Sequence, residues 1–472
     1  MLQETTPDGP AYAAIAHGFR RLISDGRIPL GTTLPSEREL TRALGVSRTT
    51  VTRAYQTLKD SGFVDARHGS GSVASLPTTA VSRDALLQST GAPHAGGERS
   101  LNLSCAAPST PPGVSAAFEV AVSELPGYLH DIGYFPSGLP ELRRAIADRY
   151  ADRGLPTDPD QVIVTSGALG ALAITLAAFG DTGDRAVLES PTYPNAIAAL
   201  RRSGLRLAGA DVTDHGWGGG AVSLTETVRQ VRPAIAYLMP DWQNPTGQLM
   251  TDGQRQEVAR ALRDSSTLAV VDETTAELAI DDSPQPLPFA AHLADTITLG
   301  SASKTYWGGL RIGWIRAPRS RIPALLDARL VLDLGTPVVE QLALTHLMGR
   351  HEELIALRRQ QLAEARSTLV RALAELLPSW SYRVPRGGLS LWCELPVPAS
   401  SLLVSAAEQH GLQLAAGPLF APEGGLERFV RVPFTLAPPV LDRAAERLAE
   451  AWEETLGSHP RARRRTTPTL VT

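Results

Sequence analysis

Only two of the chain's 45 basic residues are lysines, Lys59 and Lys304. Lys304 stands in a Gly-Ser-Ala-Ser-Lys stretch, with Ser301 and Ser303 just before it and Arg311 seven residues after it. An amine can lose its proton in a dry pocket and condense with an aldehyde, whereas a guanidinium stays protonated and cannot. Hydroxyls and a guanidinium around such a lysine suit an aldehyde that carries a phosphate. The alternative is a solvent-exposed lysine in a Gly/Ser loop.

Further candidate residues follow apolar, strand-like runs between residues 101 and 456. These runs alternate with helical ones, which predicts an α/β domain with a mostly parallel sheet, helices on both faces and a smaller α+β part. Sheets of this kind bind ligands at the ends of their strands. At these ends stand a carboxylate, an amide, an aromatic ring and a small-residue turn into a helix: Asp272, Asn244, Tyr193 and Ser166-Gly167-Ala168.

Most of these residues also have an ordinary structural interpretation. Asn244 stands in Asn-Pro-Thr-Gly, which is turn chemistry, and Tyr193 taken alone is a core tyrosine. Asp272 is harder to explain, because a carboxylate at the end of a buried strand is costly unless a cation or a strong donor meets it. A protonated pyridine nitrogen is such a partner, and the pairing would make the ring an electron sink.

Residues 11–75 carry a different pattern. After a first helical segment, Ser36 opens a capping box that starts a second helix, Gly45 turns the chain, and Ser47 caps a third. Two short strand-like runs around glycines follow, as in a wing. The segment has more cations than anions, although the whole chain has a net charge of −4. This pattern predicts a DNA-binding helix-turn-helix, and the alternative is a small helical module for protein contact.

The side chains expected to face DNA lie mainly at the start of the third helix. Arginine can fork onto guanine, and hydroxyls at a helix N-terminus suit phosphates. The candidates are Ser47, Arg48, Thr49, Thr50 and, one turn later, Arg53.

The rest of the chain indicates where the protein works. Residues 76–100 are rich in Thr, Ser, Gly, Ala and Pro, which predicts a flexible linker, and residues 457–472 predict a disordered basic tail. Two cysteines make no disulfide framework or metal cluster. The polar N-terminus is not a signal peptide, and the longest uncharged run contains turn glycines. We therefore expect a cytoplasmic, nucleoid-associated protein with no membrane or metal partner.

These motifs resemble two known families. Leu34-Pro-Ser-Glu-Arg-Glu-Leu, Gly45-Val-Ser-Arg-Thr-Thr-Val and His68-Gly-Ser-Gly-Ser-Val resemble GntR-type winged helix-turn-helix repressors. The Ser-x-Ser-Lys-x6-Arg motif around Lys304, with the strand-end residues in their order, resembles the fold-type I, class I aminotransferases, which bind pyridoxal phosphate (PLP). A fusion of the two looks like the MocR subfamily of GntR regulators.

The resemblance implies a role for each residue. Lys304 would form the internal aldimine, Asp272 would pair with the pyridine nitrogen, Asn244 would bond the 3′-oxygen, and Tyr193 would stack on the ring. Arg431, in Arg-Phe-Val-Arg, would bind a substrate carboxylate. The phosphate would be held by Ser166, Gly167, Ala168, Ser301, Ser303, Arg311 and, from a neighbouring subunit, Tyr134. In the head, Arg38, Arg48, Thr49 and Thr50 would contact the major groove, and His68 and Gly69 would belong to the wing.

One departure from the aminotransferase pattern bears on activity. Relatives carry a tyrosine shortly after the aspartate, where this chain has Thr274 and Thr275. We expect PLP to bind, with aldimine formation or partial reactions rather than efficient transamination. The resemblance thus implies a homodimeric regulator in which PLP, or its external aldimine with an amino compound, controls binding to a double-stranded operator. Two alternatives are an active aminotransferase with a DNA-tethering head and a sensor of PLP alone.

Overall fold

The computed structural model describes residues 10–24, 28, 32–67, 71–75, 100–212, 223–281 and 285–458. His68, Gly69, most of the expected linker and nearly all of the expected tail lie outside these residues. The described residues fall into an N-terminal head, residues 10–75, and a body, residues 100–458. No helix in the described ranges is long and apolar enough to cross a membrane.

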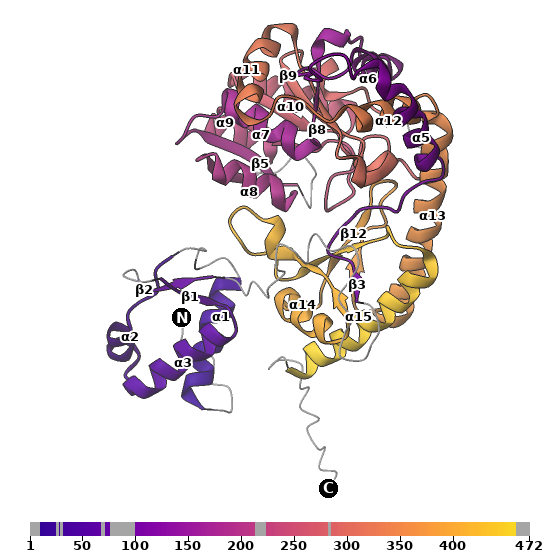
Figure 1. Ribbon diagram of the computed structural model, residues 1–472. Coiled ribbons are helices and arrows are strands. Elements are labelled where there is room, and N and C mark those ends of the chain that lie inside the picture. The colour runs from indigo at the N-terminus through magenta and orange to yellow at the C-terminus, as the bar shows by residue number, and fades with distance from the viewer. Residues whose placement is uncertain are drawn as a thin grey trace.

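The head is a three-helix unit with a two-stranded antiparallel sheet (Figure 1). Ser36 caps the second helix through a full capping box with Glu39, and Gly45 ends that helix at a φ of 65°, a conformation that glycine adopts without strain. The head's core draws on its own elements alone. The elements are α1 (Ala11–Ser24), α2 (Glu37–Leu44), α3 (Arg48–Asp60), β1 (Val64–Arg67) and β2 (Gly71–Ala74).

The body's main sheet has seven strands in the order β4-β10-β9-β8-β7-β5-β6. All neighbouring strands from β9 to β6 are parallel, so the predicted mostly parallel sheet is confirmed, while β10 runs antiparallel to both of its neighbours. The strands are β4 (Val162–Thr165), β5 (Arg185–Ser190), β6 (Arg206–Asp211), β7 (Ile235–Leu238), β8 (Leu268–Asp272), β9 (Thr296–Ser301) and β10 (Gly313–Arg316).

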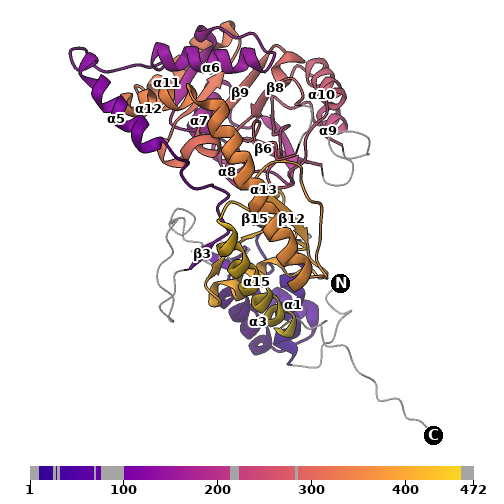
Figure 2. The same ribbon diagram turned by 90° about the vertical axis from the view of Figure 1, so that its right-hand side faces the viewer.

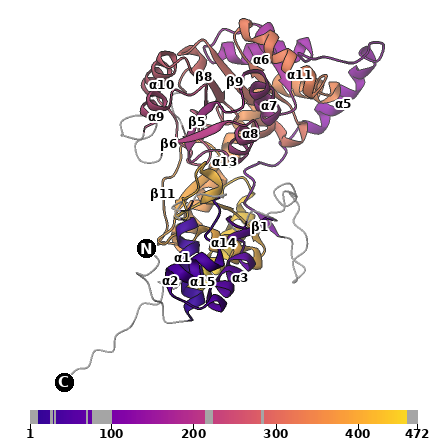
Figure 3. The same cartoon turned by 90° about the vertical axis from the view of Figure 1, so that its left-hand side faces the viewer.

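Helices cover both faces of this sheet, because its strands are apolar on both sides (Figure 3). Ala236 and Leu238 of β7 pack with α9 and α10, whereas Ile235 and Tyr237 of the same strand pack in the core of α7, α8 and α11. A third cluster joins α5, α6 and α12. The helices are α5 (Val114–Glu124), α6 (Pro140–Asp152), α7 (Ala168–Phe179), α8 (Pro194–Arg202), α9 (Leu224–Val231), α10 (Asp252–Asp264), α11 (Ile322–Leu332) and α12 (Val338–Met348).

The C-terminal part of the body is smaller and is reached along the long helix α13 (Figure 2). Its sheet, in the order β11-β12-β15-β14, is antiparallel, and α13 and α15 pack against each other beside it. The first strand of the body, β3, joins this part by pairing in parallel with β13. The elements are β3 (Leu101–Asn102), α13 (His351–Leu376), β11 (Ser381–Tyr382), β12 (Ser390–Glu394), α14 (Ser400–Gln409), β13 (Leu412–Gln413), β14 (Ala415–Ala416), β15 (Phe429–Pro433) and α15 (Pro438–Ser458).

Candidate functional site

Lys304 lies on a short π-helical turn, η4 (Ser303–Trp307), that follows β9. Its Nζ donates a 2.8 Å hydrogen bond to the backbone carbonyl of Ala106. Burial lowers the pKa of the Lys304 ammonium, which raises the fraction of neutral amine near neutral pH. The side chain is therefore not a solvated loop lysine, and its burial makes it easier to lose the proton that an amine must lose before it acts as a nucleophile.

Asp272 ends β8 and is only 4% exposed. Its Oδ2 accepts a 2.7 Å hydrogen bond from the Tyr237 hydroxyl, and its Oδ1 accepts one of 2.9 Å from the backbone amide of Thr274. Burial, followed by the Asp272 charge, raises the pKa of Tyr237 well above its usual value, so the phenol keeps its proton and donates. Within the described residues no basic side chain forms a salt bridge with this carboxylate, which leaves a place for a cationic partner.

A second group of residues forms a small cradle where α7 begins. Gly167 is the N-cap of α7 at a φ of 83°, and a Cβ on it would lie 2.7 Å from Nη2 of Arg311. A Cβ on Gly313 would also come within 2.4 Å of the Gly167 backbone. Only glycines allow this approach, which brings an arginine beside free helix amides, an arrangement suited to an anion.

The other residues expected to hold a phosphate lie close by in the chain. Ser301 is buried at the end of β9 and its Oγ accepts a 3.1 Å hydrogen bond from the amide of Ser303. Ser166 is exposed and Ala168 is half-buried at the start of α7. Tyr134 differs from these, since its side chain is 60% exposed on the loop before α6.

Arg431, on β15, brings the smaller part of the body to the site. Its Nη1 donates a 3.2 Å hydrogen bond to Oδ1 of Asn244, and its Nη2 donates to the carbonyl of Ser104. The guanidinium lies 5.0 Å from the ring centroid of Phe420, and its buried Nε has no partner among the described residues. Burial lowers the pKa of Arg431 to about 10. A buried guanidinium without a carboxylate partner suits an anionic ligand group.

Tyr193 is the N-cap of α8, and its hydroxyl accepts a 2.9 Å hydrogen bond from Nδ2 of Asn195. Burial raises the pKa of Tyr193, and the Asp272 charge raises it further, while Arg431 opposes that shift. Tyr193, Asp272 and Arg431 are thus near enough to influence one another electrostatically, although they come from three separate elements.

The threonines after Asp272 do not replace a phenol. The buried Oγ1 of Thr275 donates a 2.7 Å hydrogen bond to the carbonyl of Asp241, so this hydroxyl is used inside the protein. Oγ1 of Thr274 is buried and has no partner among the described residues. Neither side chain has the reach of a tyrosine.

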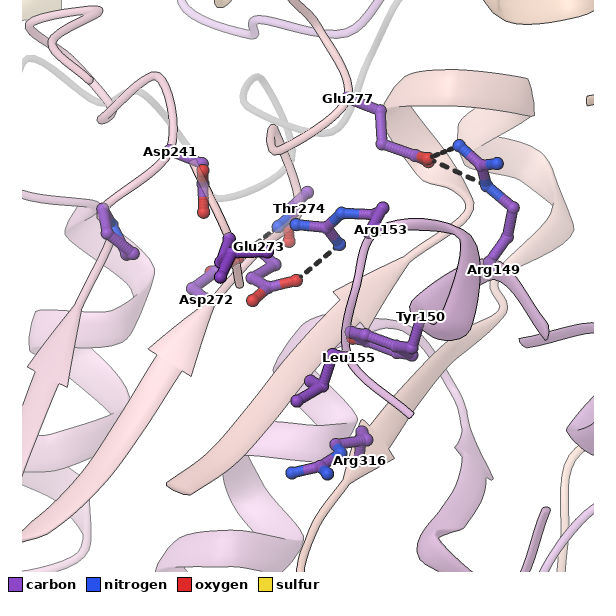
Figure 4. A network of polar contacts seen from close by, with 12 residues as sticks. Arg149, Tyr150, Arg153, Leu155, Asp241, Asp272, Glu273, Thr274, Glu277 and Arg316 are labelled. Atoms are coloured by element: carbon purple, nitrogen blue, oxygen red, sulfur yellow. Dashed lines mark hydrogen bonds and ion pairs between the residues drawn. The ribbon is translucent and has the colours of Figure 1, made fainter. Parts of the chain in front are cut away.

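The residue after Asp272 points to a separate network of charges (Figure 4). Glu273 pairs with Arg153 at 2.7 Å, with the carboxylate almost fully buried. Burial raises the pKa of Glu273, and the Arg153 guanidinium opposes that rise. Nearby, Arg149 pairs with Glu277. Figure 4 shows both ion pairs, Glu273 with Arg153 and Glu277 with Arg149.

Sequence reasoning missed two features of this site. Tyr237 stands inside an apolar strand, so the pattern marks it as a core residue. The stretch that contributes the carbonyls of Ser104 and Ala106 has no motif at all, and its position follows only from the β3–β13 pairing. The sole signal available was that Tyr237 is a polar side chain in a run that is otherwise aliphatic.

In the head, the residues expected to contact DNA lie at the N-terminal end of α3 or near it. The Oγ of Ser47 accepts a 3.1 Å hydrogen bond from the amide of Thr50, so Ser47 acts as a cap. Arg48 is 83% exposed, while the guanidinium of Arg53 lies 4.2 Å from the ring centroid of Tyr12 on α1. The remaining candidates, Arg38 and Thr49, are exposed.

Comparison with known proteins supports the family resemblance of both the head and the body. Residues 11–73 match the family of bacterial regulatory proteins of the gntR type, and residues 131–448 match the aminotransferase class I and II family. The HTH-type transcriptional regulator YdcR of Escherichia coli is 30% identical over 89% of this chain and 94% of its own. The probable rhizopine catabolism regulatory protein MocR of Rhizobium meliloti is 29% identical over 71% of this chain and 70% of its own.

The chain belongs to the MocR subfamily of GntR-type regulators. Among solved structures, this MocR-type chain resembles the α-aminoadipate aminotransferase LysN of Thermus thermophilus, complexed with N-(5′-phosphopyridoxyl)-L-leucine. The two share 25% identity with a TM-score of 0.70, over 81% of this chain and 96% of LysN. The body of this MocR-type regulator therefore has the fold-type I architecture, and its cofactor is PLP.

Proposed function

We propose that this MocR-type regulator controls its binding to an operator through PLP held on Lys304, either alone or together with an amino compound. The proposal rests mainly on two side chains, Lys304 and Asp272, each of which has the chemistry to bind a different part of the cofactor. Lys304 is an amine whose pKa is lowered by burial, and Asp272 is a buried carboxylate that meets two neutral donors. Lys304 can condense with an aldehyde, and Asp272 can pair with a protonated pyridine nitrogen.

The described residues fit the cofactor. When bound, PLP supplies an aldehyde with which a primary amine condenses, forming a carbon–nitrogen double bond and releasing water. Asp272 would hold the ring nitrogen protonated, Asn244 would face the 3′-oxygen, and Tyr193 would cover the ring. The phosphate would lie on the α7 amides beside Arg311, with Ser166, Gly167, Ala168, Ser301 and Ser303 around it. Arg431 would bind the carboxylate of an amino compound.

The proposal also includes a homodimer. Exposed apolar side chains gather on two stretches of the body, the region from α5 to the loop before α6 and the C-terminal end of α11. Val331 is 86% exposed and Ile132 is 78% exposed, which is unusual for aliphatic residues of a monomer surface. Covering these stretches with a second copy would carry Tyr134 to the partner's phosphate. The dimer would act on DNA in the cytoplasm, with Arg48 and Thr49 of each head in the major groove.

A second candidate function is transamination, favoured by the same Lys304 and Asp272 pair. The position of Thr275 opposes it, because this hydroxyl is bonded to a backbone carbonyl and cannot reach a cofactor as a phenol would. Sustained production of a keto acid from an amino donor would support the enzyme. A single half-reaction that then stops would support the regulator.

The test is an absorbance spectrum of the purified protein with PLP, compared with the Lys304→Ala variant. Lys59, the other lysine of the chain, provides the matched control as Lys59→Ala. We expect a cofactor band in the wild type and in Lys59→Ala, and none in Lys304→Ala. Equal bands in all three would overturn the assignment of Lys304.

DNA control is tested with a DNA fragment selected by the full-length protein from a randomised pool. Fluorescence anisotropy would measure the affinity for that fragment with and without PLP, and with PLP plus amino compounds. A change with PLP alone would favour a sensor of the cofactor, and a change that also needs an amine would favour an amino-compound effector. An unchanged affinity in every arm would refute regulation through this site.

A further inference from the structure

Two backbone carbonyls of one short segment are held by the two cations of the site. The carbonyl of Ala106 accepts from Nζ of Lys304 at 2.8 Å, and the carbonyl of Ser104 accepts from Nη2 of Arg431. Both residues are buried, while Cys105 between them is exposed. Residues two apart in an extended chain face the same way, so one segment presents both acceptors to the site.

The ends of this segment are anchored elsewhere. At its start, the amides of Leu101 and Leu103 donate at 2.8 Å to the carbonyls of Gly411 and Gln413 beside it. Oδ1 of Asn102 accepts from the amides of Ser104 and Cys105, which builds the local turn. At the far end, the carbonyl of Ser109 accepts from Nη2 of Arg358 at 2.8 Å. We call residues 101–109 the strap.

Between these anchors, the hydrogen bonds from Lys304 and Arg431 are the main polar contacts of the strap. Among the hydrogen bonds of the described residues, those from Lys304 and Arg431 are the ones that join residues 104–108 to the rest of the body. The strap is also the first described stretch of the body after the head, so it forms part of the covalent route between the two. Any change at the strap therefore acts on the chain that leads to the DNA-binding head.

We propose that the strap is a ligand-released tie, fastened in the unliganded protein by Lys304 and Arg431. This rests on the proposed function, in which the same two side chains bind the ligand. A Lys304 nitrogen that condensed with an aldehyde, with loss of water, would no longer be a free donor to the carbonyl of Ala106. Once Arg431 forks onto a carboxylate, its Nη2 turns from Ser104. Buried carbonyls left without donors favour movement of the strap toward water.

The two contacts respond to different functional groups of the ligand. With PLP alone, the Lys304 nitrogen would be bonded to the aldehyde carbon and its contact with Ala106 would open. An amine that replaces Lys304 on the aldehyde sets this nitrogen free again, so an amine without a carboxylate would restore the contact with Ala106 and leave Arg431 on Ser104. An amino acid also sets Lys304 free, but its carboxylate holds Arg431 and keeps Ser104 released. The geometry thus assigns lasting release in the presence of an amine to amino acids.

Hydrogen–deuterium exchange of the full-length protein tests the tie. The amides of Leu101, Leu103, Ser104 and Cys105 are the reporters, since each is hydrogen-bonded in the fastened strap. Without any ligand, Arg431→Ala and Lys304→Ala should each speed exchange of these amides by about tenfold. Helix α10, which packs in the core formed with α9 and β7, is the internal control and should be unaffected. Unchanged reporters in both variants would overturn the proposal.

The ligand arms use PLP, PLP with L-alanine, and PLP with ethylamine, which lacks the carboxylate. Binding in each arm is followed by the cofactor spectrum. We expect exchange to rise with PLP, to stay raised with L-alanine, and to fall back toward the unliganded rate with ethylamine. In Lys304→Ala, PLP should add nothing. Slower exchange in the PLP arm would mean that the ligand closes the strap, which contradicts release.

A variant of Asn102 tests the link to DNA without touching either cation. Asn102→Ala removes the acceptor that shapes the strap, so its affinity for the selected DNA without ligand should shift toward the PLP-bound value of the wild type. Asn102→Asp, which keeps the accepting oxygen, should restore the wild-type behaviour. If the wild-type protein showed no cofactor band after addition of PLP, the proposed function itself would be refuted. A normal band and a normal DNA response with unchanged strap exchange would defeat only the strap.

Discussion

Asp272 and Glu273 are adjacent acidic residues at the end of the same buried strand, yet the structure treats them in opposite ways. Asp272 receives hydrogen bonds from a phenol and a backbone amide, both neutral. Glu273 is met by the Arg153 guanidinium at 2.7 Å. Figure 4 shows Glu273 paired with Arg153 within the charge network that follows β8.

On the proposed function, this difference would separate a carboxylate that binds the ligand from one that stabilises the fold. A buried ion is tolerated when a partner of opposite charge is built into the fold, as for Glu273. Where the fold supplies only neutral donors, as for Asp272, the missing positive charge is left for a ligand to bring. Burial alone does not distinguish the two, since Asp272 is 4% exposed and Glu273 is 6% exposed.

The largest expected effect comes from removing the built-in partner. Arg153→Ala leaves Glu273 buried without a cation, and we expect the free energy of unfolding to fall by about 3 kcal/mol. Chemical denaturation measures this change. PLP affinity should change little, and the double variant Arg153→Ala with Glu273→Gln should recover part of the stability. A stable single variant would show that Glu273 does not depend on Arg153.

Asp272→Asn should give the opposite result. The unliganded protein should be as stable as the wild type, or more stable by up to about 1 kcal/mol, because an uncompensated charge is removed. The affinity for PLP, measured by titration of the cofactor band, should fall by about a hundredfold or more. Loss of stability without loss of PLP affinity would mean that the roles of the two carboxylates are reversed.

Glu277 extends the comparison to pH. Burial opposes its ionisation, but the hydrogen bond and charge of His351 and the charge of Arg149 outweigh it and lower the pKa of Glu277 to about 2 from 4.5. A carboxylate whose folded pKa is depressed stabilises the fold above its ordinary pKa and loses that contribution as pH falls, here between about 4.5 and 2. Glu277→Gln should remove about 2 kcal/mol at neutral pH and nothing near pH 2. Denaturation curves at several pH values, compared with wild type, measure the difference.

Tyr237→Phe should have the smallest effect, and it sharpens the role of the neutral donor. Asp272 keeps its amide contact but loses the phenol, so we expect a loss of about 1.5 kcal/mol in unfolding free energy and a fall of less than about tenfold in PLP affinity. Tyr382→Phe is the matched control, because this hydroxyl donates to the carbonyl of Val370 away from the site. Identical behaviour of the two variants would assign Tyr237 no role in the site.

The sequence predicted those features of the fold and of the site that depend on local patterns of residues. The alternation of strands and helices gave the mostly parallel sheet, and a lysine in an arginine-rich chain drew attention to Lys304. The antiparallel direction of β10 was not predicted, because a strand's direction leaves no trace in its own residues. The partner of Glu273 was not predicted either, since Arg153 lies 120 residues earlier.

The site residues show the same limit. Asp272 stood out because a carboxylate ends an apolar run, but its donor Tyr237 has the pattern of a core residue. Arg53 was expected near DNA from its place on α3, yet its guanidinium lies over Tyr12, a contact with another helix that the pattern of α3 does not contain. Pairings between distant segments depend on the whole chain, so they become visible only when the chain is folded.

The pairing of β3 with β13 has a consequence for synthesis. The head's core uses only its own residues, so it can fold as soon as it leaves the ribosome. The start of the body, by contrast, waits for Leu412 and Gln413, more than 300 residues later. At ordinary elongation rates this delay is roughly fifteen seconds to a minute. During that time each nascent chain carries a folded helix-turn-helix head whose aminotransferase-like body has yet to be completed.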